Sequence, residues 1–152
     1  GIGKMKAALE GRKDPNLVVA GRTSAFQING TDDAIERAKA YEHIGVDAIF
    51  FAGLSTRDQL EAARNSIDIP IMLGGTPKEI EDKNYLASMG VKIALQGHLP
   101  FMASVKATRD TMKALRDGKL PSEISPAALD TELMNKVTRD QQFKDWFQEF
   151  LT

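Results

Sequence analysis

Two side chains suited to binding or catalysis follow apolar runs that end in glycine. Arg22 comes directly after Val18–Gly21, and His98 comes directly after Ala94–Gly97. An arginine guanidinium presents a planar fork of donors that matches a carboxylate or a phosphate. A histidine at such a position can orient a substrate oxygen or transfer a proton. Both are therefore candidate site residues, and both have structural alternatives: a salt bridge to a neighbouring loop for Arg22, and a helix-start histidine bonded to backbone for His98.

Four units, each a strand followed by a helix, are expected to position these side chains. The strands are apolar runs without alternation, which is typical of parallel strands buried on both faces. They are expected over 17–20, 48–52, 69–73 and 92–96, and the last three begin about 22 residues apart, as in a βα repeat. Loops after parallel strands carry the chemistry in such folds. Four units make half of a (β/α)8 TIM-type barrel, and an open doubly wound sheet is the alternative.

Capping signals indicate where several helices begin. Thr31 or Asp32 can cap the helix that follows the first strand. Thr56 with Gln59 three residues later is the pattern of a capping box. Residues 76–79 combine a threonine, a proline and a glutamate in the order expected for an N-cap, N1 and N3, which predicts another helix start.

The chain changes character near Gly118, where a long helix that starts at Pro100 is expected to end. We expect a linker over 119–125 and a helical tail over 127–151. The candidate apolar positions of that tail are Leu129, Leu133, Val137, Phe143, Trp146, Phe147 and Phe150. We therefore predict a half-barrel over 1–118 and a linker with a helical tail over 119–152, which packs on its own barrel or on a neighbouring subunit.

Composition narrows the classes of protein to consider. The chain has 152 residues, 42% of them hydrophobic, and a net charge of −1. This charge does not favour nucleic acid or membrane binding. Cysteine is absent, which excludes disulfides, thiolate metal sites and a cysteine nucleophile. We expect a cytoplasmic protein, and, because the chain begins at Gly1 without a methionine, a processed or partial polypeptide.

Several strings together resemble the isocitrate lyase / phosphoenolpyruvate mutase superfamily. Residues 14–25 resemble its fifth-strand segment, an Asp-Pro turn and apolar strand followed by Ala-Arg-Thr-Asp or a variant. Residues 33–41 and 45–50 are similar to the unit that comes next. The likeness covers roughly residues 3 to 118, and it implies the C-terminal half of a (β/α)8 barrel.

The oxaloacetate decarboxylase branch is the most similar one. The isocitrate and methylisocitrate lyases usually carry Pro-Glu after the sixth strand and an asparagine after the seventh, where this chain has Phe51-Ala52 and Gly74-Gly75. In contrast, residues 96–98 (Gln-Gly-His) and 105–108 resemble the decarboxylases, whose eighth strand ends in Gly-His. The tyrosine that often follows the seventh strand in that branch is absent, which leaves the preferred substrate open.

The resemblance implies Mg²⁺-dependent decarboxylation of oxaloacetate to pyruvate and CO₂. In this interpretation Arg22 binds a substrate carboxylate, and His98 donates a hydrogen bond to the departing carboxylate or to the enolate oxygen. Thr23 and Ser24 add hydroxyl contacts. The family's metal-binding acids lie on earlier strands, so we expect no metal ligands in this chain. An N-terminal half-barrel would then complete the site.

Two other functions remain open. One is a C–C or C–P bond lyase or mutase of the same superfamily that acts on a small hydroxy- or keto-dicarboxylate. The other is a non-catalytic half-barrel that only assembles with a partner. The resemblance further implies a homo-oligomer, commonly a tetramer, whose subunits exchange the last barrel helix. No nucleic acid or membrane partner is expected.

Overall fold

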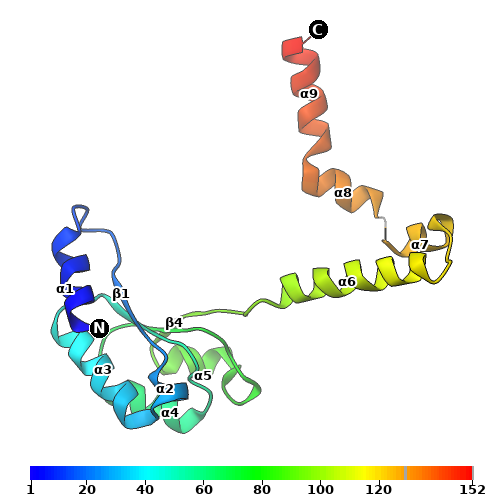
Figure 1. Cartoon of the computed structure of the whole chain (residues 1–152). Coiled ribbons are helices and arrows are strands. Elements are labelled where there is room, and N and C mark those ends of the chain that lie inside the picture. Colours follow the sequence, from blue (N-terminus) through cyan, green and yellow to red (C-terminus); the bar gives the residue numbers. More distant parts are fainter. Residues whose placement is uncertain (129, 152) are drawn as a thin grey trace. The chain divides into compact units, whose positions relative to one another are not determined.

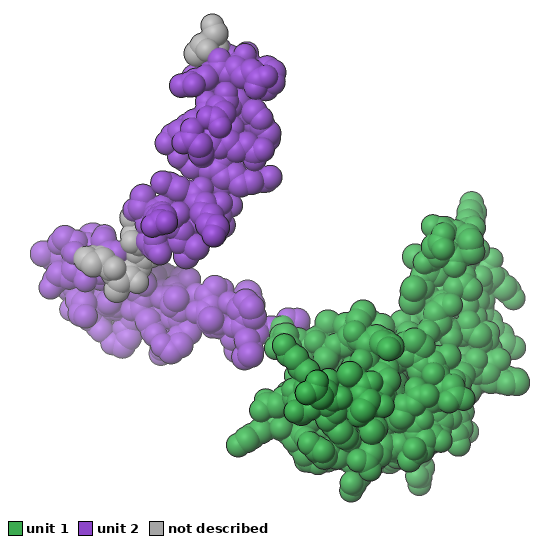
Figure 2. Space-filling model, turned by 180° about the vertical axis from the view of Figure 1, so that it is seen from behind, with its two compact units in different colours: residues 1–97 green, residues 98–152 purple. Residues whose placement is uncertain are grey.

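The computed structural model describes residues 1–128 and 130–151, and it divides the chain into two units, residues 1–97 and 98–152 (Figure 2). Each unit is described by itself. The division lies between Gly97 and His98. The domain boundary expected at Gly118 stays a prediction.

The first unit is a sheet of parallel strands connected by helices (Figure 1). Its elements are α1 (Ile2–Gly11), β1 (Ala20–Thr23), α2 (Ala25–Ile28), α3 (Thr31–His43), β2 (Ala48–Phe51), α4 (Arg57–Arg64), β3 (Ile71–Leu73), the 3₁₀ helix η1 (Lys78–Ile80), α5 (Lys83–Ser88) and β4 (Val91–Ala94). The strand order is β1-β2-β3-β4, and all neighbours pair in parallel. This sequential parallel order confirms the four predicted βα units.

The two faces of the sheet differ in burial. Side chains alternate along each strand, so one set points toward the helices and the other set points away from them. The helix-facing set includes Ile49, Phe51, Ile71 and Leu73, and all four are fully buried. The predicted burial on both faces is therefore complete for these four side chains of the helix face, whereas on the opposite face Ala48 is buried, Phe50 and Met72 are half-buried, and Arg22 is exposed.

Small and aromatic residues set the packing of the helices on the sheet. Ala34 and Ala38 of α3 are fully buried, and their short side chains let α3 approach the strands closely. A Cβ on Gly21 would lie 2.7 Å from Cδ2 of Tyr41, so glycine is required for β1 to accept the ring of Tyr41. The core therefore depends on particular small residues as well as on the apolar pattern.

The first strand begins later than predicted. The run over 17–20 was expected to be a buried strand, but β1 starts at Ala20, and Leu17 and Val18 are exposed. Strand pairing starts where Ala20 meets Ala48. One residue earlier, the Val19 N–H donates to Oδ2 of Asp47 at 2.7 Å. The Val19 carbonyl still accepts the Asp47 N–H at 2.9 Å, so backbone pairing reaches Val19 but not Leu17 and Val18.

Helix starts follow the capping prediction at one place and differ at two. The capping box of α4 is confirmed, with Thr56 and Gln59 satisfying each other's backbone N–H groups. The cap predicted at Thr31 or Asp32 is wrong: Gly30 is the N-cap of α3, with a φ of 94° that favours glycine. Thr31 is instead the first helical residue.

The helix predicted to start at 76–79 is replaced by η1, and α5 follows only after Asp82, which caps it. The reason lies in the contacts of Glu79. Its Oε1 accepts the Arg57 backbone N–H at 3.0 Å, so the carboxylate binds the start of α4. The Arg57 guanidinium also stacks over the Tyr85 ring at 4.2 Å. These contacts attach η1 and α5 to the start of α4.

The second unit consists of α6 (Leu99–Arg116), α7 (Pro121–Ala128), α8 (Thr131–Thr138) and α9 (Asp140–Leu151). The predicted long helix is confirmed as α6. The linker over 119–125 is wrong after Leu120, because Pro121 begins α7 and Glu123 accepts the Leu120 N–H at 2.7 Å. The tail is broken rather than continuous: Asp130 caps α8, and Arg139 ends it in the left-handed region.

The large apolar side chains that the structure describes in the second unit are exposed, apart from the half-buried Ile124. This is true of every predicted apolar position of the tail except Leu129, which lies outside the described residues. α6, α8 and α9 have no buried residue at all. Within the described chain, no helix has both the length and the apolar composition that crossing a membrane requires.

Candidate functional site

Arg22 lies within β1 rather than in the loop after it. It sits on the face of the sheet that points away from the helices, and its direct neighbour across the ladder is Phe50 of β2. The guanidinium carbon is 5.9 Å from the centroid of the Phe50 ring. Among the described residues, no carboxylate forms an ion pair with Arg22. The guanidinium therefore keeps its donors available for an anionic ligand.

Thr23 and Ser24 follow Arg22 but lie in different surroundings. Thr23 is buried on the helix-facing side, where its Oγ1 accepts the Ala25 N–H at 3.1 Å. This bond ties the end of β1 to the start of α2. Ser24 is the N-cap residue of α2, but its side chain makes no capping bond. Ser24 is therefore the freer of the two hydroxyl groups.

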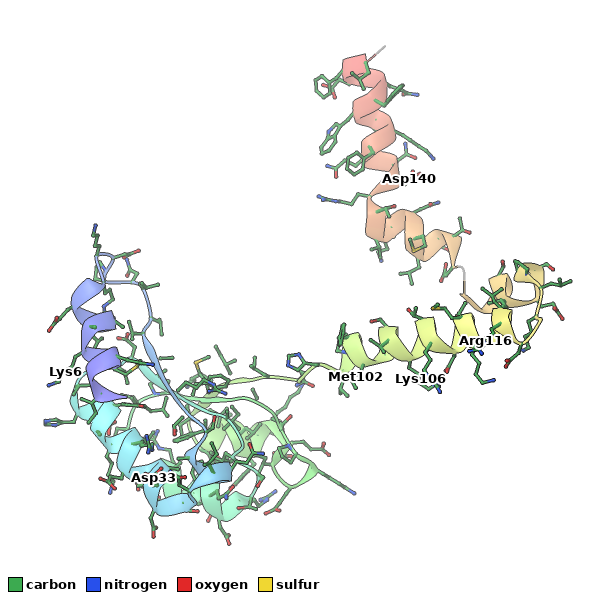
Figure 3. The ribbon with its side chains drawn as sticks, in the orientation of Figure 1. Lys6, Asp33, Met102, Lys106, Arg116 and Asp140 are labelled. Carbon is green, nitrogen blue, oxygen red and sulfur yellow. The ribbon has the colours of Figure 1, made fainter. Side chains whose placement is uncertain are left out.

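His98 is the first residue of the second unit and the N-cap residue of α6. Its side chain is exposed and makes no capping hydrogen bond, so the alternative of a backbone-bonded imidazole is not what the structure contains. The His98 carbonyl instead accepts the Met102 N–H at 3.0 Å. Figure 3 shows α6 with Met102, Lys106 and Arg116 labelled.

A cavity of about 440 Å³ lies where β1, β2 and β3 end. This is the end of the sheet where parallel folds place their sites. The residues that line the cavity come from α2 and from the loops after β2 and β3: Phe26, Gln27, Gly53, Leu54, Ser55, Gly74, Gly75 and Pro77. Glycines that directly follow β2 and β3 thus form part of the wall of this cavity.

Gly53 is essential to the shape of this cavity. Its φ is 84°, and a Cβ there would lie 2.8 Å from Cβ of Gln27. Only glycine combines this backbone conformation with so close an approach. The loop after β2 therefore packs directly against α2.

Sequence reasoning missed Gln27 and Ser55. Gln27 lies on α2, a four-residue helix that no capping or periodicity signal predicted. Ser55 directly precedes the capping box, and its N–H and hydroxyl both donate to Oε1 of Gln59, at 2.8 and 3.3 Å. Their proximity to glycines that end strands was the available signal, since such loops meet at one end of a parallel sheet.

A metal site needs several ligands that converge. Among the described residues, no three His, Asp or Glu side chains lie close enough together to hold a metal ion.

Comparison with known proteins relates this chain to one family. Residues 2–116 match the model of phosphoenolpyruvate phosphomutase. An oxaloacetate decarboxylase of Bradyrhizobium sp. (strain ORS 278) is 50% identical over 153 residues, which cover 99% of this chain and 52% of that protein. An oxaloacetate decarboxylase of Rhodopseudomonas palustris (strain TIE-1) is 48% identical, with coverage of 99% and 52%. The chain thus spans about half the length of these curated relatives.

Solved structures confirm the fold. Phosphonopyruvate hydrolase superposes with a TM-score of 0.80 at 27% identity, over 99% of this chain and 56% of that one. A phosphoenolpyruvate phosphomutase from Streptomyces platensis subsp. rosaceus gives a TM-score of 0.82 at 20% identity, over 99% and 54%. The fold is therefore half of a (β/α)8 barrel with further C-terminal helices, as predicted. The chain belongs to the phosphoenolpyruvate phosphomutase family.

Proposed function

We propose that this chain contributes half of the active site of an oxaloacetate decarboxylase, a carboxy-lyase. One observation of the structure carries the proposal: an arginine without an ion-pair partner among the described residues lies on the sheet face away from the helices. The identity of about half with named oxaloacetate decarboxylases, over nearly the whole chain, supports the choice of substrate.

The proposed reaction breaks the C3–C4 bond of oxaloacetate. C4 leaves as CO₂, and the bonding electron pair passes to C3 and is delocalised onto the C2 oxygen as an enolate. A proton added at C3 then gives pyruvate. Groups that bind the developing negative charge in the transition state lower the barrier more than groups that bind only the substrate.

Each candidate residue has a role in this reaction. Arg22 holds a substrate carboxylate through its planar fork and so fixes the orientation of the bond that breaks. His98 donates a hydrogen bond to the departing carboxylate or to the enolate oxygen. Ser24 adds a hydroxyl contact. Thr23 adds a second hydroxyl contact to the substrate, because its hydroxyl can donate a proton while it accepts the Ala25 N–H.

The rest of the site must come from elsewhere. We propose Mg²⁺ as the cofactor, with ligands outside this chain, and this fits the lack of a cluster of three His, Asp or Glu side chains among the described residues. The four-stranded sheet leaves β1 and β4 as edge strands, which expose unpaired backbone groups unless another segment covers them. An N-terminal half-barrel would pair with both edges. We further propose a cytoplasmic homo-oligomer, a tetramer, in which the last barrel helix is exchanged.

The test is pyruvate release from oxaloacetate by the assembled enzyme, with and without Mg²⁺. A blank with Mg²⁺ and no enzyme is required, because oxaloacetate also decomposes by itself. We expect release well above this blank. Arg22→Ala is expected to lower kcat/KM by at least about 10²-fold, the effect of losing a positioning group. Activity within a few-fold of wild type would remove the role assigned to Arg22.

A second candidate is a C–C or C–P bond lyase of the same superfamily. The likeness to phosphonopyruvate hydrolase supports this second candidate, because it combines a TM-score of 0.80 with 27% sequence identity over 99% of this chain. Phosphonopyruvate and branched hydroxy-dicarboxylates would distinguish the two candidates. Turnover of one of these and not of oxaloacetate would replace the decarboxylase, and turnover of none would favour a non-catalytic half-barrel.

A further inference from the structure

The ring of Phe50 lies between Arg22 and Gly74. On one side, Arg22 is its direct neighbour in the β1–β2 ladder, with the guanidinium carbon 5.9 Å from the ring centroid. On the other side, a Cβ added to Gly74 would lie 3.3 Å from both Cε2 and Cζ of the ring. Gly74 itself lines the cavity at the strand ends. The ring therefore links the arginine to the wall of that cavity.

Arg22 has little else to hold it. Its side chain is exposed, and among the described residues it has no ion pair. A long, exposed side chain samples many rotamers, and ordering it on ligand binding reduces affinity. An aromatic face within about 6 Å attracts a guanidinium and favours the rotamers that lie over it. The cation–π contact with the Phe50 ring thus restricts Arg22.

Arg57 provides a useful contrast within the same unit. It also stacks on a ring, that of Tyr85, but its Nε donates to the Glu79 carbonyl at 3.2 Å. Arg57 therefore already has a hydrogen-bond partner within the protein. Arg22 has the ring without such a partner, which is the arrangement expected of an arginine that is oriented for an external anion.

Gly74 is explained by the same ring. Its φ is not in the left-handed region, so the backbone there does not itself require glycine. The nearest atoms to an added Cβ are the two carbons of the Phe50 ring, at a distance tighter than most Cβ contacts. The missing side chain at Gly74 therefore leaves space for the ring to lie where it does.

We propose that Phe50 is a positioning residue that holds the Arg22 guanidinium ready for the substrate carboxylate, and that Gly74 keeps the space this ring needs. The inference rests on the proposed function, since it assumes that Arg22 binds a carboxylate. It makes Phe50 act through Arg22, and not through its own contact with the substrate.

A double-mutant cycle on the assembled enzyme tests the inference. Phe50→Leu removes the ring and keeps an apolar side chain, and we expect kcat/KM for oxaloacetate to fall about fivefold, the scale of a partly exposed cation–π contact. In the Arg22→Ala background the same change should have no effect beyond about twofold, because residues that act through each other are not additive. Equal losses in the two backgrounds would overturn the inference.

Further variants separate positioning from general damage to the fold. Phe50→Tyr keeps the ring and should retain nearly full activity. Gly74→Ala should reproduce part of the Phe50→Leu loss, again only when Arg22 is present. Met72→Leu, on the neighbouring strand in register with Phe50, is the matched control and should change little. A loss for Met72→Leu as large as that for Phe50→Leu would show a structural effect and would overturn the inference.

Binding of oxalate distinguishes failure of the inference from failure of the proposed function. Oxalate is a probe for the carboxylate site and needs no turnover, and its Kd is measured by calorimetry on the same variants. If wild type binds oxalate without decarboxylating oxaloacetate, the proposed reaction fails. The double-mutant cycle of Phe50 and Arg22, measured as the Kd for oxalate, then still tests the inference. If oxalate binding does not depend on Arg22, the inference fails even in an active enzyme.

Discussion

The two units of this chain use the same helical pattern with opposite results. In the first unit, the apolar stripes of α3 and α4 are buried against the sheet, and Ala38 and Leu60 are fully buried. In the second unit, α6, α8 and α9 carry comparable stripes that are exposed. An amphipathic pattern therefore predicts that the apolar face of a helix is buried, but it does not identify the surface that covers this face.

The largest expected difference between the units is in the effect of deleting an apolar side chain. Leu60→Ala creates a cavity in the core of the first unit and should lower the free energy of unfolding by about 3 kcal/mol. Phe147→Ala removes an exposed ring of α9 and should change the unfolding of the first unit by less than about 0.5 kcal/mol. Denaturant titrations of the assembled enzyme, followed by hydrogen exchange in β2 and β3, measure both. Similar effects would mean that the second unit supports the core directly.

Backbone conformation gives the next largest effect. Gly53→Ala places a Cβ at a φ of 84° and 2.8 Å from Cβ of Gln27, and we expect a loss of about 2 kcal/mol in stability. Gly75→Ala is the matched control, because a Cβ there meets no atom within 4 Å and its φ is not in the left-handed region. Thermal unfolding of both variants checks this expectation. A stable Gly53→Ala protein would show that the loop after β2 can move away from α2.

Helix caps should contribute a similar free energy of stabilisation in the two units. Thr56 accepts the Gln59 N–H at 3.3 Å in α4, and Asp130 accepts the Leu133 N–H at 2.9 Å in α8. Alanine at either position should destabilise its own helix by about 1 kcal/mol. Hydrogen exchange of the first-turn amides measures each effect locally. A loss at Thr56 that spreads through the sheet would show that α4 is coupled to the core more strongly than α8 is to its neighbours.

The smallest expected effect is electrostatic. Arg37 holds the pKa of Asp33 below its usual value through a side-chain hydrogen bond, with help from Asn29, and Lys106 does the same for the pKa of Asp110 on α6. A lowered pKa in the folded state contributes stability above the unfolded pKa of about 4, and this contribution is lost as the pH falls through the folded value. Asp110 is exposed and Asp33 is half-buried at the surface, so the contribution should be small in both cases. NMR titration of the two carboxyl carbons should give midpoints below that of a model peptide, and midpoints at the model value would contradict the ion pairs.

The order of the elements and the type of fold could be read from the sequence. The apolar runs over 48–52 and 69–73 predicted parallel strands, and the capping box at Thr56 predicted the start of α4. These signals are local, since they depend on residues a few positions apart. Two predictions were wrong, namely the start of the first strand and the helix at 76–79. In both places a carboxylate binds a backbone N–H that is distant in the sequence: Asp47 binds that of Val19, and Glu79 binds that of Arg57.

The residues of the candidate site were predicted only in part. Arg22 and His98 could be chosen because their side chains carry suitable chemistry after apolar runs. Their roles stay predictions, as do those of Thr23 and Ser24. Gln27 could not be chosen, since its place beside the cavity depends on the close approach of α2 to Gly53.

The sequence by itself determined the order of the four strands and the places of α3, α4 and α6, because hydrophobic period and capping act over a few residues. It also determined the family, because strings of residues such as 14–25 are specific. Only the tertiary structure decided which face of the sheet is covered, which set Arg22 on the exposed side and Thr23 on the buried one. It also decided that the Phe50 ring lies between Arg22 and Gly74, because contacts between strands depend on register, which no single segment specifies.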